Sequence, residues 1–177
     1  RSAKMNKDVM FSSEKMDWET PQELFDKLNQ EFDFDTDVCA TVENAKCKIF
    51  FTEEDDALEL NWGLGLVDPD DYSSTVCWMN PPYGREIGKW IKKAYEESQN
   101  HNCTVVCLIP SRTDTKYWHD YVMKAKEVRF IKGRLTFVGA PAPAPFPSAI
   151  VIFEKNTSPY LFPIKITSYE LDREEKD

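Results

Sequence analysis

The sequence predicts an α/β domain built around a doubly wound, mostly parallel sheet. Apolar runs of strand length alternate with amphipathic helical segments along most of the chain. One run, residues 104–109, is continuously apolar and stops at Pro110, which fits a central parallel strand buried on both faces. The 177 residues suit a single domain, which we expect over residues 17–166, after a flexible segment 1–16 and before an acidic tail 167–177.

The first helix is predicted to begin at Thr20. Thr20 can cap this helix, Pro21 fits its first turn, and Glu23 completes a capping box. Four apolar residues at helical spacing then form one buried face: Leu24, Phe25, Leu28 and Phe32. Residues 34–38 are predicted to form the first strand of the sheet.

The remaining elements continue the alternation of strands and helices. Strands are predicted over 75–79, 104–109 and 127–131, and helices over 86–99 and 114–125. Residues 134–138 and 148–153 are expected to pair as an antiparallel hairpin at one edge of the sheet, joined by the Pro-Ala segment 141–147. Residues 160–166 add an edge strand or a tail. This combination is a Rossmann-like layout.

Composition and cysteine usage indicate a globular protein with reduced thiols. Hydrophobic residues make up 41% and charged residues 30%, which is typical of a folded rather than a disordered chain. No apolar stretch approaches the roughly 18 residues that span a bilayer, and the first ten residues lack the apolar core of a signal peptide, so we expect no membrane partner. The cysteines are Cys39, Cys47, Cys77, Cys103 and Cys107. Their odd number and their spacing predict a cytoplasmic protein without disulfides or a bound metal.

The net charge of -9 argues against a nucleic-acid partner, because DNA binding requires Lys and Arg to neutralise phosphates. The charge is unevenly distributed, however. Between Arg112 and Arg134 seven basic residues face three acids. A DNA-binding face and an ordinary solvated surface both fit this segment.

A four-residue motif directly follows the strand predicted over 75–79: Asn80, Pro81, Pro82 and Tyr83. In open α/β sheets, ligands bind at the carboxyl ends of the strands. The Asn80 side-chain carbonyl and the Pro81 main-chain carbonyl are acceptors, the prolines fix their direction, and the tyrosine offers a ring for stacking. This set fits a planar group with an exocyclic amine, whose nucleophilicity toward a methyl donor the two acceptors would increase. A surface turn is the alternative, because Asn-Pro and Pro-Pro are common in turns.

Further short segments accompany this motif in order along residues 17–154. They are Trp18–Pro21, Phe34–Thr41, Asn44–Cys47, Asp56–Leu58 with Trp62, Asn80–Gly84, Leu108–Ser111, Thr113–Lys116, Gly133–Phe137 and Ala144–Ser148. On these segments the chain resembles the phage-type DNA N6-adenine methyltransferases, the Dam-like family. A chance match to one segment is easy, whereas a chance match to the ordered set is not.

The resemblance implies a class I methyltransferase fold, S-adenosylmethionine as the methyl donor, and the N6 amine of adenine in DNA as the acceptor. It implies that residues 80–83 are the catalytic motif, which holds the N6 of a flipped adenine. It places the cofactor against ten residues: Trp18, Thr20, Pro21, Asp37, Cys39, Ala40, Asp56, Ala57, Leu58 and Asn80. Many methyltransferases have a Gly-rich cofactor loop, whereas residues 40–42 are Ala-Thr-Val here, so we expect a wider loop.

Four cations are candidates for contact with double-stranded DNA: Arg85, Arg112, Lys116 and Arg134. Sequence-specific methyltransferases usually add a recognition domain that reads base edges, and the patternless stretches here are too short for one. A homodimer or relaxed sequence specificity would compensate. The enzyme must also take the target adenine out of the base stack, at a cost of roughly a few kcal/mol.

Other functions and purely structural roles stay open at this stage. The same chemistry serves methylation of RNA adenine or of a protein glutamine amide, and the acidic net charge keeps such substrates in view. A third hypothesis is a non-enzymatic phage DNA-binding module, which would take up no cofactor. Asp37 and Asp56 can simply cap turns, Trp18 can pack on the first helix, and Arg134 can brace the sheet edge. The resemblance also implies a phage or prophage origin in a bacterial host cell, whereas the biological purpose, such as shielding phage DNA from restriction, stays open.

Overall fold

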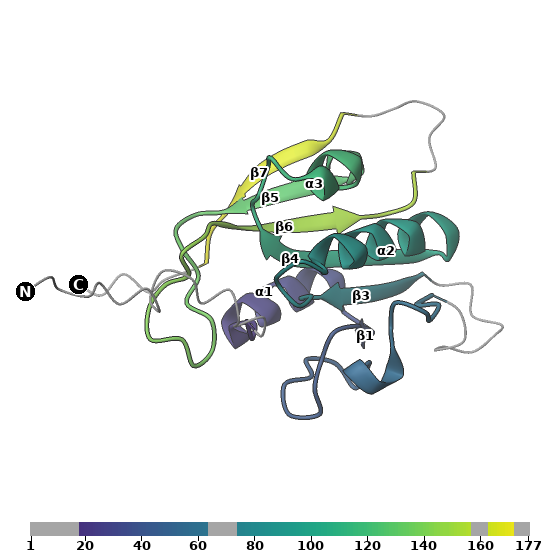
Figure 1. Cartoon of the computed structure of the whole chain (residues 1–177), viewed down its shortest axis with the longest axis horizontal. Helices are drawn as coiled ribbons and strands as arrows, with labels where there is room; N and C mark the ends of the chain where they lie inside the picture. The colour runs from purple at the N-terminus through teal and green to yellow at the C-terminus, as the bar shows by residue number, and fades with distance from the viewer. Residues whose placement is uncertain (1–17, 64–73, 157–162, 172–177) are drawn as a thin grey trace, which may run out of the picture.

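The computed structural model describes residues 18–63, 74–156 and 163–171 (Figure 1). In chain order its elements are α1 (Gln22–Phe32), β1 (Thr36–Asp37), β2 (Ile49–Phe50), the 3-10 helix η2 (Glu53–Asp55), β3 (Thr75–Met79), α2 (Ile87–Asn100), β4 (Cys103–Pro110), α3 (Lys116–Asp120), the 3-10 helix η3 (Val122–Lys124), β5 (Glu127–Ile131), β6 (Ser148–Phe153) and β7 (Lys165–Tyr169). Within these ranges no helix is long and apolar enough to cross a bilayer.

The seven strands form one sheet in the order β2-β1-β3-β4-β6-β5-β7. Every neighbouring pair is parallel except the two that include β6, which runs antiparallel to β4 and to β5. Helix α2 lies in front of β4 and β6 in Figure 1 and contacts α3. This mostly parallel sheet with an antiparallel portion confirms the predicted fold class, and it has the layout of a class I methyltransferase.

The position of the antiparallel strand differs from the sequence-based expectation. Residues 134–138 form no strand, so the predicted hairpin with residues 148–153 is wrong. Strand β6 instead fills the slot between β4 and β5, which its composition explains, because all six of its residues are buried. The sheet edge is β7, which is parallel to β5 and extends to Tyr169, beyond the domain boundary expected at residue 166.

Three other elements have different bounds from those expected. Helix α1 begins at Gln22 behind Pro21, and no side chain caps it, so the capping role assigned to Thr20 is wrong. The helix expected over 114–125 is the short α3 followed by η3. Strand β1 contains two residues instead of five, and the apolar run at 49–50 pairs with it as β2.

The core beneath the site is aromatic. Phe25 of α1 packs edge-on against Trp78 of β3 with ring centroids 5.7 Å apart, and Phe34 packs on the same tryptophan at 5.5 Å.

All five cysteines are free thiols, and the sulfur atoms of Cys77 and Cys103, on neighbouring strands, lie 3.2 Å apart. Burial raises the pKa of the Cys107 thiol, as expected for an unreactive core residue.

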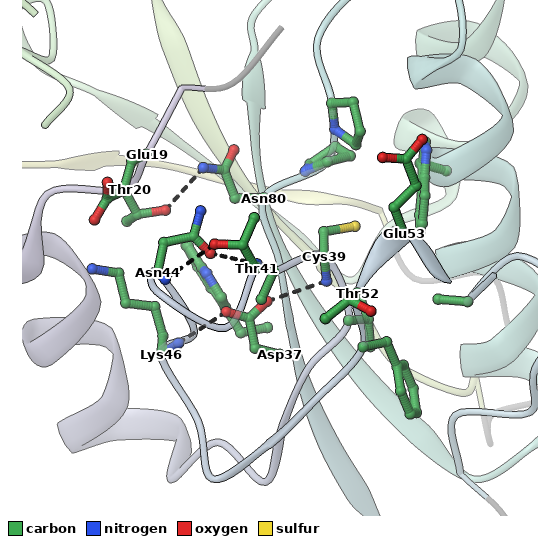
Figure 2. A pocket seen from close by; sticks show the side chains of 18 of the residues that line it. Glu19, Thr20, Asp37, Cys39, Thr41, Asn44, Lys46, Thr52, Glu53 and Asn80 are labelled. Carbon is green, nitrogen blue, oxygen red and sulfur yellow. Dashed lines mark hydrogen bonds between the residues drawn. The ribbon is translucent and has the colours of Figure 1, made fainter. Parts of the chain in front are cut away.

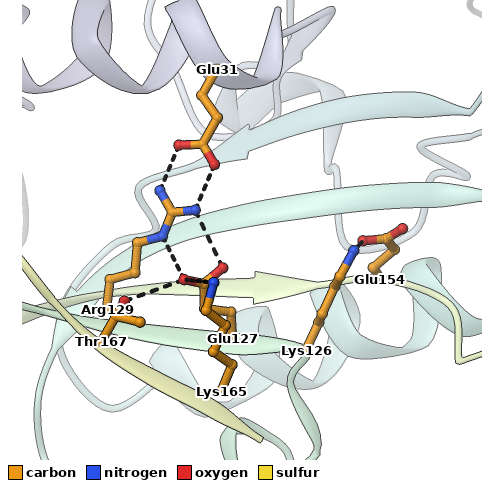
Figure 3. A network of polar contacts seen from close by, with 7 residues as sticks. All are labelled: Glu31, Lys126, Glu127, Arg129, Glu154, Lys165 and Thr167. Atoms are coloured by element: carbon orange, nitrogen blue, oxygen red, sulfur yellow. Dashed lines mark hydrogen bonds and ion pairs between the residues drawn. The ribbon is translucent and has the colours of Figure 1, made fainter.

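An ionic network joins α1 to the β5–β7 edge of the sheet (Figure 3). Both terminal nitrogens of Arg129 on β5 donate to the carboxylate of Glu31 on α1, each at 2.6 Å. The Nε of Arg129 donates to Glu127 Oε1 at 3.0 Å, and that oxygen also accepts from Thr167 on β7 at 3.2 Å. Lys165 of β7 lies 3.7 Å from the same atom. The network therefore fixes α1, and the segment that precedes it, relative to the sheet.

Candidate active site

A cavity of about 730 Å³ opens at the carboxyl ends of β1, β2 and β3. Its walls are formed by residues 18–20, 37–44, 46, 51–54, 56–58, 78, 80–82, 86 and 90. The volume lies in the range of cofactor and small-molecule sites, and the position is the one where open α/β sheets bind ligands. Figure 2 shows that Thr20, Asp37, Asn44 and Asn80 come from separate segments and meet around this space.

Asn80 directly follows β3 and is held by the segment before α1. Its Nδ2 donates to the main-chain oxygen of Trp18 at 2.5 Å and to Thr20 Oγ1 at 3.0 Å (Figure 2). Both amide hydrogens are therefore used within the protein. The Oδ1 atom is buried and accepts no hydrogen bond from the described residues. Burying an acceptor without a donor lowers the stability of the folded protein. The Oδ1 atom is therefore available to accept a hydrogen bond from a ligand.

The other residues of the motif have different positions. Pro81 and Pro82 line the cavity, whereas Tyr83 does not. Tyr83 is 7% exposed, and its hydroxyl donates to the main-chain oxygen of Leu108 on β4 at 3.1 Å. Burial raises the pKa of the Tyr83 hydroxyl. The exposed stacking face expected of Tyr83 is thus not present in this structure, because the ring is enclosed and its hydroxyl fastens the motif to β4.

Asp37 ends β1 at the base of the cavity and is 3% exposed. Its Oδ1 accepts the main-chain N–H of Cys39 at 3.2 Å, and its Oδ2 accepts that of Lys46 at 3.0 Å (Figure 2). Burial raises the pKa of the carboxyl to about 6, although these two hydrogen bonds oppose the rise. The carboxylate therefore shapes the loop and is poised for a cationic partner.

The loop after Ala40 replaces a Gly-rich turn with side-chain hydrogen bonds. The N–H of Thr41 donates to Asn44 Oδ1 at 2.7 Å, and the N–H of Asn44 donates back to Thr41 Oγ1 at 3.2 Å. The N–H of Ala45 closes the turn on the Thr41 carbonyl at 3.1 Å. These hydrogen bonds close one turn of the chain without a glycine. The Ala-Thr-Val sequence therefore forms a defined loop in the cavity wall.

The opposite wall of the cavity is acidic, and a hydrogen bond from Trp62 holds it in place. Glu53, Glu54 and Asp56 line the cavity after β2, and Asp56 has a φ of 51°. Ala57, the next residue, is buried, and its carbonyl accepts the indole N–H of Trp62 at 2.8 Å. This wall therefore combines carboxylates at its rim with a rigid apolar base.

The carboxylate of Glu97, on α2, anchors Trp62 in turn. Glu97 is 1% exposed, and its Oε2 accepts the main-chain N–H of Trp62 at 2.9 Å. Lys93 lies 2.7 Å from its other oxygen, and His101 Nδ1 lies 2.9 Å from Oε2. A Cβ at Gly63 would lie 1.8 Å from the carbonyl oxygen of His101, so only glycine allows this approach. Helix α2 thus holds the acidic wall in place.

Comparison with known proteins gives the family. The family model described as DNA N-6-adenine-methyltransferase (Dam) matches residues 8–175, nearly the whole chain. The chain belongs to the Dam family. It is 34% identical over 137 residues to the DNA N-6-adenine-methyltransferase of Haemophilus phage HP1 (strain HP1c1), an alignment that covers 76% of this chain and 73% of that protein.

A second phage relative of this Dam family member is more distant. The DNA N-6-adenine-methyltransferase of Escherichia phage T1 is 30% identical over 120 residues, which cover 67% of this chain and 46% of that protein. The predicted family, the phage-type Dam-like methyltransferases, is therefore confirmed.

The structure of the Dam family chain places the expected site residues in two groups. All the residues expected to bind the cofactor line the cavity except Pro21, which lies outside it and precedes α1 as its N-cap. The four cations expected to meet DNA, at positions 85, 112, 116 and 134, are all exposed. They follow β3, β4 and β5, three of them in connections and Lys116 at the start of α3, and so share the carboxyl edge of the sheet with Asn80. Lys116 is ion-paired with Asp120, and Arg134 donates to the Ala144 carbonyl at 3.4 Å.

Several residues that line the cavity of this Dam family chain were not predicted from the sequence. They are Glu19, Val42, Glu43, Lys46, Phe51, Thr52, Glu53, Glu54, Trp78, Glu86 and Trp90. The acids after residues 49–50 could have been found, because an apolar pair followed by acids is what the end of a second parallel strand requires.

The described residues contain no group of three or more His, Cys, Asp or Glu that could hold a metal ion.

Proposed function

We propose that this chain transfers a methyl group from S-adenosylmethionine to the N6 amine of adenine in double-stranded DNA. The observation that carries the proposal is the Asn80 side chain, whose Nδ2 is bound by Trp18 and Thr20 while Oδ1 stays buried without a donor. A neutral acceptor in this position suits an exocyclic NH2 group. Membership of the Dam family supports adenine as the bearer of that group.

The cavity fits S-adenosylmethionine in its donor and acceptor chemistry. Asp37 would hold the ammonium of the methionine moiety, since it is the buried carboxylate at the base. Glu53, Glu54 and Asp56 would accept hydrogen bonds from the ribose hydroxyls and the adenine amine. Ala57 and Leu58 would pack on the adenine ring. Trp18, Thr20, Cys39 and Ala40 complete the walls around the donor.

Bound S-adenosylmethionine would supply an electrophilic methyl group on a sulfonium. The protein contributes the orientation of the acceptor amine. Asn80 Oδ1 would accept one N6 hydrogen and the main-chain carbonyl of Pro81 would accept the other, so that the two acceptors would orient the amine and increase its nucleophilicity. The prolines hold these acceptors in place, and Tyr83 keeps the motif attached to β4 through Leu108.

Arg85, Arg112, Lys116 and Arg134 would contact DNA phosphates along the same edge of the sheet. Such contacts release counterions, so binding should weaken steeply with salt. A homodimer stays a prediction, which sedimentation with and without DNA would test.

The proposal is tested by incubating the protein with labelled S-adenosylmethionine and, in separate reactions, unmethylated duplex DNA, RNA and a protein extract. We expect N6-methyladenine in the duplex, and its loss with Asn80→Ala while the variant still binds cofactor. Label in RNA or in protein but not in DNA would show that the substrate is RNA adenine or a protein glutamine amide. The acidic net charge is compatible with both. Failure of the wild-type protein to bind cofactor in calorimetry would leave a non-enzymatic DNA-binding role.

A further inference from the structure

The connection between β5 and β6, residues 132–147, lies at the carboxyl edge of the sheet beside the candidate site. Strand β5 points in the same direction as β3 and β4, because both β4 and β5 are antiparallel to β6 and β3 is parallel to β4. The connection contains no helix or strand. Long ordered connections at the binding edge of a sheet are usually functional.

Four aromatic rings fix both arms of this loop to the catalytic motif. Phe137 lies 5.2 Å from Trp18 and 6.2 Å from Tyr83, measured between ring centroids. Phe146, in the returning arm, lies 5.3 Å from Trp18 and 5.6 Å from Tyr83. Because the Trp18 carbonyl also holds Asn80, the loop and the Oδ1 acceptor belong to one rigid unit.

The loop presents Val138 next to the cavity. The N–H of Val138 donates at 3.1 Å to the carbonyl of Glu19, a residue of the cavity wall. The chain then turns at Gly139, whose φ is 73°, and the N–H of Ala140 returns to the Phe137 carbonyl at 3.0 Å. Val138 is 48% exposed, although its neighbour Phe137 is buried. Its backbone is thus held firmly while its apolar side chain faces outward.

The charge of this region suits a polyanion. The protein contains 31 acidic residues, yet none occurs between Glu127 and Glu154. Arg134, at the start of the loop, is exposed. The loop itself therefore adds no acidic side chain that would repel phosphates.

We propose that Val138 enters the DNA duplex and fills the space that the target adenine leaves when it moves into the active site. The inference rests on the proposed function, since it concerns the same DNA substrate. An extruded base leaves an unstacked gap, and apolar side chains inserted between base steps stabilise such distortions. Val138 has the required properties: it is apolar, exposed, rigidly held and fixed relative to Asn80.

The test compares kcat/KM on two duplexes that differ only opposite the target adenine. In one duplex the adenine pairs with thymine, and in the other it faces an abasic site. Val138→Ala should lower kcat/KM on the paired duplex on the order of tenfold, because the cost of extrusion is no longer offset. On the unpaired duplex the loss should stay within about twofold, because there the pairing is already absent. Val138→Ile, which keeps an apolar side chain, should retain wild-type rates on both.

Met123→Ala is the matched control, because Met123 is 51% exposed and lies outside the site. It should leave both rates unchanged, and all three variants should unfold at the wild-type temperature. A fluorescent adenine analogue at the target position should brighten on binding to wild type and less with Val138→Ala. Equal losses on the two duplexes, or no loss on either, would overturn the role of Val138. An inactive wild-type protein on both duplexes would instead overturn the proposed function on which this role depends.

Discussion

The side-chain amide of Asn80 donates a hydrogen bond of 3.0 Å to Thr20 Oγ1, although 60 positions separate the two residues. An asparagine amide can present either its oxygen or its nitrogen to a ligand, and the two ends have opposite hydrogen-bonding character. Thr20 and the Trp18 carbonyl bind the nitrogen end, so the oxygen remains available to a ligand. The segment before α1 therefore determines which end of the amide the proposed catalytic motif presents.

Thr20→Val tests this role with little change in shape. The variant loses one of the two acceptors of the Asn80 amide, so the Trp18 carbonyl alone holds the nitrogen end and the amide is oriented less firmly. We expect kcat to fall on the order of tenfold to a hundredfold, since one oriented hydrogen bond is lost. Thr20→Ser keeps the hydroxyl and should retain most of the activity. Cofactor affinity is measured in parallel by calorimetry, and a loss confined to cofactor affinity would contradict the orienting role.

The Asp37 carboxyl predicts how cofactor binding depends on pH. Burial raises its pKa to about 6, so the group is protonated and neutral below that pH. A neutral group cannot pair with the ammonium of S-adenosylmethionine. Affinity should therefore be highest near pH 7 and fall by about tenfold per pH unit below pH 6. A carboxyl carbon titration followed by NMR should show the pKa of Asp37 falling when cofactor is added, and an unchanged pKa would place the ammonium elsewhere.

Glu97→Gln tests whether α2 supports the acidic wall. The change removes the charge that faces Lys93 and His101 while it keeps an acceptor for the Trp62 N–H. Because the carboxylate is buried, we expect the free energy of unfolding to fall by about 2–4 kcal/mol. Cofactor affinity of the folded variant should also fall, because a neutral amide accepts the Trp62 N–H more weakly than the carboxylate does, and Trp62 holds the Ala57 carbonyl.

Glu96→Gln provides the control for that experiment. Glu96 is on the same helix, its side chain is 48% exposed, and it pairs only loosely with Lys92 at 3.7 Å. Its replacement should change stability by less than about 0.5 kcal/mol and leave cofactor affinity unchanged. If the two variants behaved alike in urea unfolding and in calorimetry, the buried network would have no special role.

Arg129→Leu tests the network that fastens α1 to the sheet. The side chain of Arg129 is 11% exposed, whereas that of Glu31 is 48% exposed, so solvent weakens part of the interaction. Loss of the guanidinium leaves Glu127 with Lys165 and the Thr167 hydroxyl, and we expect a cost of about 2 kcal/mol at pH 7. Urea unfolding of both proteins across pH measures this difference.

The pH dependence of that difference follows from two lowered carboxyl pKa values. The hydrogen bonds from Arg129 lower the pKa of Glu31. Burial tends to raise the pKa of Glu127, but Arg129 outweighs this and the net pKa is lowered. Carboxyls with lowered pKa values contribute stability above their ordinary pKa of about 4.5, and the contribution is lost as pH falls through the lowered value. The gap between wild type and Arg129→Leu should therefore shrink below about pH 4, and a gap independent of pH would contradict the ionic account.

Much of the fold could be predicted because local pattern and tertiary structure agree. Residues 75–79 and 127–131 are strands within the bounds expected, and residues 87–100 form the helix expected over 86–99. The slot of β6 could not be predicted from pattern alone. A buried apolar run such as residues 148–153 fits any central strand, and its direction depends on the path of the preceding loop.

The site divides in the same way. Asn80 could be placed at the binding edge because it directly follows an apolar strand, and Asp37 because it matches the family's cofactor motif at the end of the first predicted strand. The Thr20 hydroxyl could not, since a threonine before proline at a helix start fits a cap equally well, and only the folded chain brings it to Asn80. Tyr83 likewise has a ring suited to stacking, and only the surrounding Phe137 and Phe146 explain why it is enclosed.

The placement of β6 has a consequence for how the chain folds. Strands β4 and β5 cannot pair with each other while the slot between them is vacant, so each keeps an open edge of backbone donors and acceptors until residues 148–153 arrive. Those residues are among the last of the sheet to leave the ribosome, and their pairs with β4 join distant parts of the chain, such as Val105 with Phe153. Pulse-labelled hydrogen exchange should show late protection of β6, and early protection would exclude this order. The loop carrying Val138 closes only when β6 pairs, so newly made protein should gain the ability to bind cofactor before it gains the ability to bind DNA.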